Sequence, residues 1–221
     1  MLNLIVCKIL PPALALVTLA VTLLFGERTG KLRIKAIFKT LTSALFLLTA
    51  LLQSPQHRYD WLMVAGLAMC AVGDVALIRR DRAWFLTGLV AFLLGHVAYT
   101  LAFNARTSML LLPTAAIAVI GTVSIALFLY FRRHLGRMLL PVTAYVAVIT
   151  LMLMSAWAVA AAEGGDGGPG VLIATAATLF YVSDITVARD RFVPGAGFAN
   201  RAFGLPLYYV AQFLFAFSIG R

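Results

Sequence analysis

The sequence predicts an all-α polytopic membrane protein with eight transmembrane helices, and three observations support this prediction. Hydrophobic residues make up 62% of the 221 residues and charged residues only 12%, whereas a soluble domain is nearer to half apolar and a quarter charged. The mean hydropathy is strongly positive, at +0.98. The apolar residues also come in blocks of about 17 to 25 residues, the length that crosses a bilayer core as a helix.

The eight blocks follow one another along the whole chain, separated in order by the turns "ERTGK", "QSPQHRYD", "RRDR", "NARTS", "RRHLGR", "EGGDGGPG" and "RDRFVPGAGFANR". The first block is too long for a signal peptide and lacks a small-residue cleavage site before Gly26, so we interpret it as a retained helix. The glycine-rich turn at 163–170 is too short for an interdomain linker. We therefore predict a single transmembrane domain over residues 1–221, with helices at about 4–25, 34–52, 61–78, 84–103, 109–131, 138–162, 170–188 and 203–219.

The basic residues predict which way the helices face. The net charge is +10, but the lysines and arginines lie in short turns between apolar blocks, which indicates lipid headgroups rather than nucleic acid as partners. Assigned to alternate sides, 14 of the 18 lysines and arginines fall on the side of the turns after helices one, three, five and seven. Because cytoplasmic loops carry the Lys/Arg excess, we expect an inner (cell) membrane protein with both termini extracytoplasmic.

No cofactor or metal site is expected. Cys7 and Cys70 both fall in apolar segments, which favours two small core residues over a disulfide. His57 and His134 lie in turns at opposite membrane faces, so a three-histidine metal site is not expected. The sequence contains no glycine-rich phosphate loop, nucleophile elbow or HExxH motif.

Two aspartates are the main functional candidates. Of eight acidic residues, only Asp74 and Asp184 lie inside predicted helices, each about one turn from the cytoplasmic end. An ionised carboxylate at this depth costs several kcal/mol unless it faces water or a partner. The sequence therefore predicts a polar pocket that opens to the cytoplasm and contains both side chains.

Other polar residues are expected near this pocket. Lys39, Tyr208 and Tyr209 lie at a depth similar to that of the aspartates, roughly 5–8 Å below the cytoplasmic boundary. His96 is deeper, at about 18 Å along its helix, and shares a helical face with Tyr99 at position i+3.

Structural alternatives remain open for each candidate. The aspartates could cap helices or pair with Arg79 or Arg189, and Lys39 could extend to the interface. His96 could be a hydrogen-bonded core histidine.

A weak internal sequence similarity is compatible with a duplicated structure. Residues 72–103 align with 182–213 at an offset of 110, which matches Asp74 with Asp184 and Tyr99 with Tyr209. Four helices per half would make two parallel four-helix repeats. Chance alignment of apolar helices explains the match equally well.

The stretch "GDVALIRRDRAWFLTGLVAFLLGHVAY" at 73–99 resembles the hallmark of the YhhN/TMEM86 family of lysoplasmalogenases, a GD-x-x-L element followed by F-x-x-G-L-x-x-F-x-x-G-H-x-x-Y. "FYVSDITVARDRF" resembles the second hallmark of the family, and "YYVAQFLFAF" its last helix. The family usually has Lys-Pro in its second helix, whereas Thr40 follows Lys39 in this sequence.

The resemblance implies hydrolysis of the vinyl ether bond of lysoplasmalogens, lysophospholipid substrates, to a fatty aldehyde and glycerophosphoethanolamine or glycerophosphocholine. Such chemistry needs one carboxylic acid to protonate the double bond and one carboxylate to stabilise the resulting cation. We expect Asp74 and Asp184 to be these catalytic groups. The residues expected to bind substrate are Lys39, His96, Tyr99, Tyr208, Tyr209 and Gln212.

Two other functions were considered. Paired intramembrane acids also form proton relays, so a small proton-coupled transporter using Asp74 and Asp184 is the alternative. A transporter, however, usually binds its substrate near the midplane between broken helices. A lipid-binding structural protein would leave the buried charges unexplained.

Overall fold

The structure of the chain, a computed structural model, describes residues 2–79, 81–163 and 168–221. Within these ranges the chain forms helices and turns but no β-strand, which confirms the predicted all-α class. The predicted loop at 163–170 lies mostly outside the described residues, as does the side chain of Cys7. The α-helices in the described ranges are α1 (Leu2–Val21), α2 (Leu32–Leu52), α3 (Arg58–Ala76), α4 (Arg82–Arg106), α5 (Thr114–Leu135), α6 (Leu139–Glu163), α7 (Pro169–Phe192) and α8 (Phe198–Phe217).

Six stretches of the described chain are long and apolar enough to cross a membrane. One of them, Thr114–Glu163, contains both α5 and α6, and α8 is not among the six. Helix α8 carries Asn200 and Arg201 near its start and the fully buried Gln212 farther along. The chain is thus a multi-pass membrane protein by composition and helix length.

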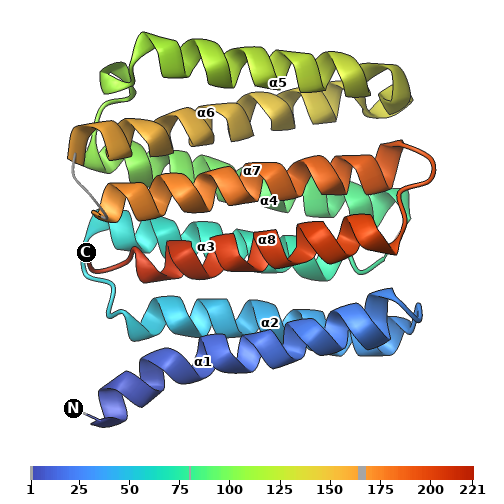
Figure 1. The fold of residues 1–221 in the computed structure, drawn as a ribbon, viewed down its shortest axis with the longest axis horizontal. Helices are drawn as coiled ribbons and strands as arrows, with labels where there is room; N and C mark the ends of the chain where they lie inside the picture. The colour runs from blue at the N-terminus through green and yellow to red at the C-terminus, as the bar shows by residue number, and fades with distance from the viewer. Residues whose placement is uncertain (1, 80, 164–167) are drawn as a thin grey trace.

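The eight helices run nearly parallel to one another in a single bundle (Figure 1). Helices α1 and α2 form one edge, α5 and α6 form the opposite edge, and α3, α4, α7 and α8 lie between them. The α1–α2, α3–α4, α5–α6 and α7–α8 turns gather at one end of the bundle, and both chain termini lie at the other. The buried core runs through the middle of the bundle and contains large aromatic side chains such as Tyr99, Phe103 and Phe180.

Helices α5, α7 and α8 differ from the expected bounds by about one turn. The fifth helix begins at Thr114 rather than near residue 109, because Pro113 adopts an extended backbone conformation and a 3-10 turn precedes it. Helix α7 continues to Phe192, and α8 begins at Phe198, about a turn before the expected start. Arg189 and Arg201, expected in a loop, therefore lie on helices.

Helix α4 begins at a side-chain cap. Asp81 accepts a hydrogen bond from the backbone N–H of Trp84 at 3.1 Å. This bond, together with the nearby guanidinium of Arg79, lowers the pKa of the Asp81 carboxyl below its ordinary value. The cap sets where α4 starts, and with it the position of His96 along the bundle.

Helices α3 and α4 pack closely through glycines spaced one heptad apart. Four glycines lie at this interface, Gly66 and Gly73 on α3 and Gly88 and Gly95 on α4. A Cβ atom at Gly73 would lie 2.6 Å from ring carbons of Phe92, which is too close for any side chain. The close approach brings Asp74, the residue after Gly73, toward the centre of the bundle.

Candidate active site

A cavity of about 230 Å³ lies among the helices and contains both aspartates in its wall, Asp74 fully buried and the Asp184 side chain 16% exposed. Asp74 comes from the last turn of α3, and Asp184 from α7, about two turns before that helix ends. Much of the remaining wall is apolar and is formed by side chains from α4, α5, α6 and α7, among them Phe85, Phe92, Leu127, Phe131, Val146, Ile149 and Ile185. The two carboxyl groups thus face one space lined mainly by apolar side chains.

Asp74 belongs to a saturated polar cluster. Its Oδ1 lies 3.1 Å from the ammonium Nζ of Lys39, which comes from α2. Its Oδ2 accepts hydrogen bonds of 2.7 Å from Ser43 of α2 and from Tyr208 of α8. Asp74 is only 1% exposed and Lys39 6% exposed. The cation and the two hydroxyls compensate for burying the carboxylate.

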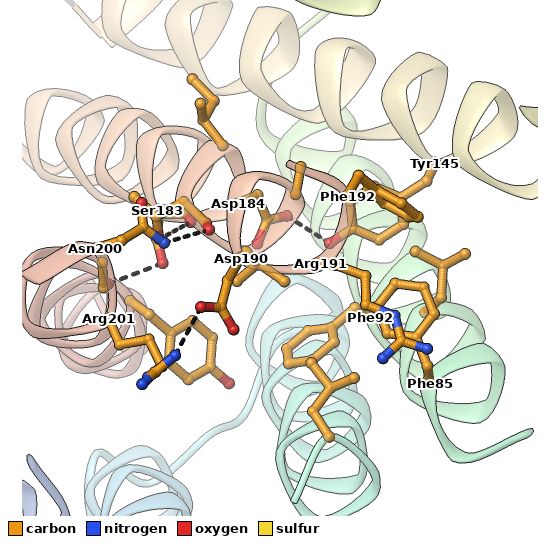
Figure 2. Close-up of a pocket in the computed structure, with 18 of the residues that line it drawn as sticks. Phe85, Phe92, Tyr145, Ser183, Asp184, Asp190, Arg191, Phe192, Asn200 and Arg201 are labelled. Atoms are coloured by element: carbon orange, nitrogen blue, oxygen red, sulfur yellow. Dashed lines mark hydrogen bonds and ion pairs between the residues drawn. The ribbon is translucent and has the colours of Figure 1, made fainter. Parts of the chain in front are cut away.

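Asp184 has a different set of neighbours. The hydroxyl of Tyr145 on α6 donates a 2.5 Å hydrogen bond to its Oδ2, as Figure 2 shows. Nε2 of His96 on α4 lies 3.8 Å from the same oxygen. His96 is fully buried, and its ring packs against Tyr145 and Phe180 at centroid distances of 5.2 and 4.6 Å. Helices α4, α6 and α7 therefore position this second acidic centre.

One end of the cavity is lined by charged residues from the helix ends. Glu27, in the π-helical turn (Thr22–Glu27) that follows α1, binds Lys35 of α2 at 2.7 Å and Arg201 of α8 at 3.0 Å. Arg201 also binds Asp190 of α7 at 2.8 Å, an ion pair visible in Figure 2. Arg191, which also lines the cavity, lies over the ring of Phe85 at 4.3 Å. These contacts tie together helices that are distant in the sequence.

The structure brings some of the predicted site residues to the cavity and not others. Lys39, Asp74, Asp184 and Tyr208 line it. Tyr99 and Gln212 instead bond to each other, with the Tyr99 hydroxyl donating to Gln212 Oε1 at 2.8 Å. Neither of them is part of the cavity wall, nor are Tyr209, whose hydroxyl donates to the Lys39 carbonyl oxygen at 3.3 Å, and His96. His96 and Tyr209 thus contact residues of the site without lining the cavity, and Tyr99 and Gln212 contact each other.

Sequence reasoning did not select Tyr145, Glu27 or Arg201. Tyr145 carries a hydroxyl within an otherwise apolar helix, and a buried tyrosine hydroxyl usually needs a partner, so a signal for this residue existed. Glu27 and Arg201 were both assigned to turns at the same membrane side. Nothing in the sequence indicated that they would meet, because 174 positions separate Glu27 from Arg201.

The arrangement is suited to acid–base chemistry on an apolar molecule. One carboxyl group is paired with a buried cation, while the other faces a tyrosine and a histidine. Both reach a space whose walls exclude much of the surrounding water. These features define the chain as a multi-pass helical membrane protein with two acidic centres in the wall of one cavity.

Comparison with known proteins agrees with this class. The YhhN family profile matches residues 34–219, and the chain belongs to the YhhN family, as its hallmark motifs predicted. It is 36% identical to the lysoplasmalogenase TMEM86A of Bos taurus over 154 residues, which cover 69% of this chain and 62% of that protein. It is 32% identical to the lysoplasmalogenase TMEM86B of Rattus norvegicus over 172 residues, 76% of this chain and 65% of the relative.

A bacterial relative is covered more fully. The chain is 29% identical to a lysoplasmalogenase of Mycobacterium tuberculosis over 192 residues, which cover 83% of this chain and 68% of that protein. The chain spans less than two thirds of the length of the two mammalian relatives described above. No solved structure matches the chain.

Proposed function

We propose that this protein hydrolyses the vinyl ether bond of lysoplasmalogens, releasing a fatty aldehyde and glycerophosphoethanolamine or glycerophosphocholine. The observation that carries the proposal is the pair of aspartates, Asp74 and Asp184, in the wall of one largely apolar cavity. The names of the relatives supply the substrate class, since they are called lysoplasmalogenases.

The reaction needs what these two side chains can supply. Protonation of the carbon–carbon double bond of a vinyl ether leaves an oxocarbenium ion, which water then attacks. A carboxylic acid donates the proton and a second carboxylate stabilises the cation, the division of labour that glycosidases use for a similar ion. No metal or cofactor is required for these steps, so turnover is expected to withstand a chelator.

The lining of the cavity supports one orientation of the lysolipid. The alkenyl chain lies against the apolar side chains of α5 and α6, such as Leu127, Val146 and Ile149. The phosphate headgroup lies toward the charged end, near Lys35 and Arg201. Lys39, expected to contact the headgroup, is instead assigned to Asp74, because its ammonium is buried beside that carboxylate.

The proposal includes the placement of the chain in the membrane. Residues 1–221 form one transmembrane domain that crosses the inner membrane eight times, with both termini extracytoplasmic. The gathering of the α1–α2, α3–α4, α5–α6 and α7–α8 turns at one end of the bundle supports this topology. Two parallel four-helix repeats would account for the helix contacts: α3 packs on α4 as α7 packs on α8, and α4 contacts α6 as α8 contacts α2.

The transporter alternative is not favoured. The relatives carry the names of enzymes. Asp74 lies in the last turn of α3, whereas Asp184, expected one turn from the end of its helix, lies about two turns from the end of α7 because that helix continues to Phe192.

The test uses purified protein with two lysolipids that differ only at the ether. A 1-alkenyl lysophosphatidylethanolamine is expected to release aldehyde, and the saturated 1-alkyl lipid is expected to release none. In deuterated water the aldehyde should carry one deuterium on the carbon next to the carbonyl, because the proposed reaction begins by protonating that carbon. Absence of aldehyde from both lipids would end the proposal, and aldehyde without deuterium would reject its chemistry.

A further inference from the structure

The two aspartates of the cavity face different partners. Asp74 faces the ammonium of Lys39 at 3.1 Å and accepts hydrogen bonds from two hydroxyls. Among the described residues, no lysine or arginine lies within ion-pair distance of Asp184, and its hydroxyl donor is Tyr145. A buried carboxyl group beside a cation is favoured as the carboxylate, whereas one without a cation is favoured as the neutral acid.

The imidazole of His96 is held in one tautomer. Its Nδ1 lies 2.6 Å from the carbonyl oxygen of Phe92, and because a carbonyl oxygen only accepts hydrogen bonds, Nδ1 carries a proton. In the neutral ring Nε2 therefore presents a lone pair. This atom is buried without a hydrogen-bond partner among the described groups and lies 3.8 Å from Asp184 Oδ2.

In an apolar environment the lone pair of His96 Nε2 and an ionised Asp184 carboxylate would repel each other. The arrangement is favourable only when the imidazole and the carboxyl group share one proton. A neutral acid beside a neutral imidazole separates no charge, so it is favoured over an ion pair where little else compensates. His96 does not line the cavity, whereas Asp184 does. Any proton that the pair delivers to a ligand in the cavity therefore leaves through Asp184.

We infer that Asp184 is the proton donor of the proposed hydrolysis, that Asp74 is the permanent anion, and that His96 is a positioning residue that keeps the transferable proton on Asp184. The inference rests on the proposed function for its reaction and on the geometry of the two clusters for its roles.

The step is balanced with water as the only co-reactant. The Asp184 proton moves to the outer alkenyl carbon, the π electrons form the new C–H bond, and the inner carbon and ether oxygen share the positive charge near Asp74. Water bonds to the inner carbon and returns a proton to Asp184. The hemiacetal then breaks its bond to the glycerol oxygen, and the hydroxyl proton moves to that oxygen. One vinyl ether and one water give one aldehyde and one alcohol.

Infrared spectroscopy of the folded protein locates the proton without relying on activity. A neutral carboxylic acid has a carbonyl stretch that a carboxylate lacks, and this band is followed between about pH 5 and pH 8. The titratable groups in contact with Asp184 are His96 from α4 and Tyr145 from α6, and Cys70 from α3 and Tyr181 from α7 interact with it electrostatically. The other charged residues that line the same cavity are Glu27, Lys35, Lys39, Asp74, Arg79, Asp190, Arg191 and Arg201.

The expected result is a band in the wild type that is lost in Asp184→Asn. The double variant Asp74→Asn with Lys39→Met removes the other carboxyl together with its cation and should keep the band. A band that survives in Asp184→Asn, disappears in the double variant, or is absent from the wild type would overturn the assignment. If the wild-type protein released no aldehyde, the proposed function would be rejected. The carboxylic acid band would still show whether Asp184 carries the proton.

His96→Asn tests the positioning role, because its amide can still donate to the Phe92 carbonyl oxygen while Nε2 is removed. We expect the midpoint pH of the band to move by about one pH unit. We also expect kcat to fall by about 10- to 100-fold with KM nearly unchanged, less than the 10²–10⁴-fold effect of removing a direct proton donor. His134→Asn, outside the cavity lining, is the matched control and should change neither. A His96→Asn variant with an unmoved band midpoint and wild-type kcat would leave His96 only a packing role.

Discussion

At the scale of single residues, this chain buries carboxyl groups in two ways. Asp60, near the start of α3, is 2% exposed and accepts backbone hydrogen bonds from Gln56, His57 and Gly220, so it connects a helix start to the end of the chain. Asp74 and Asp184 instead bond to side chains in the wall of a cavity. A structural acid and a proposed catalytic acid can therefore be compared within one protein.

Replacing Asp74 or Asp184 with asparagine is expected to reduce turnover by at least about 10²-fold, because Asp184→Asn removes the proposed proton donor and Asp74→Asn removes the proposed anion. The double variant should be little worse than the worse single variant, since groups that act as one unit are not additive. The measurement is aldehyde release per folded molecule.

Stability distinguishes these variants from a structural one. Asp60→Asn should lower the melting temperature through a loss of about 1–3 kcal/mol while keeping turnover per folded molecule, because one backbone N–H loses its acceptor. Asp74→Asn should also be less stable, since it leaves the Lys39 ammonium buried without its partner, and adding Lys39→Met should restore stability but not turnover. An Asp184→Asn protein that is folded and keeps more than about a tenth of wild-type turnover would show that Asp184 does not transfer the proton.

At the scale of elements, the α3–α4 pair supplies Asp74 to the first acidic centre and His96 to the second. Gly73 allows Phe92 to approach α3, and the carbonyl of Phe92 holds His96. Asp74 is the next residue after Gly73, so one helix contact supports both clusters. The interface depends on the absence of a side chain, which is why a single methyl group there should affect stability and chemistry together.

Gly73→Ala should destabilise the protein by about 1–3 kcal/mol, because its Cβ would lie 2.6 Å from the Phe92 ring and force a helix or the ring to move. Turnover should fall as well, since Phe92 lines the cavity. Gly121→Ala is the matched control in α5, where the nearest atom, Met154 Cε, is 3.9 Å away and alanine is the better helix former. Thermal unfolding in detergent measures the stability of the Gly73→Ala and Gly121→Ala variants. Equal melting temperatures for the two variants would contradict this account of the α3–α4 interface.

At the scale of the whole molecule, the cavity extends to the end of the bundle where charged residues from the helix ends line it. Glu27, Lys35, Asp190 and Arg201 connect the ends of α1, α2, α7 and α8 there. If this end is cytoplasmic, as the basic residues indicate, the lysolipid headgroup enters and leaves on the cytoplasmic side. The orientation of the chain then decides which leaflet supplies the substrate.

Cysteine labelling tests this orientation with one variant at each end of the bundle. Arg133→Cys, at the α5–α6 turn, should react with a membrane-impermeant maleimide only after permeabilisation, because we place it in the cytoplasm. Arg58→Cys, at the start of α3, should react in intact cells, and both wild-type residues are exposed. The unsubstituted protein gives the background from Cys7 and Cys70. The opposite pattern of labelling would invert the topology.

The sequence alone determined the features that depend on local composition. The apolar blocks predicted helices because a chain in lipid must satisfy its backbone hydrogen bonds internally. The cost of burying charge identified Asp74 and Asp184 as candidate site residues, and the family motifs pointed to the relatives that were found. The bounds of α5, α7 and α8 were less predictable, because caps and short 3-10 turns depend on one or two residues.

Only the tertiary structure decided which side chains meet. Lys39 pairs with Asp74 and not with a headgroup, Tyr145 reaches Asp184 from α6, and Tyr99 turns to Gln212 instead of the cavity. Spacing within a helix predicts which residues share a face, but it carries no information on the rotation and height of one helix against another. Those two quantities come from packing across the whole bundle. They separate two aspartates that look alike in the sequence into one beside a cation and one beside a histidine.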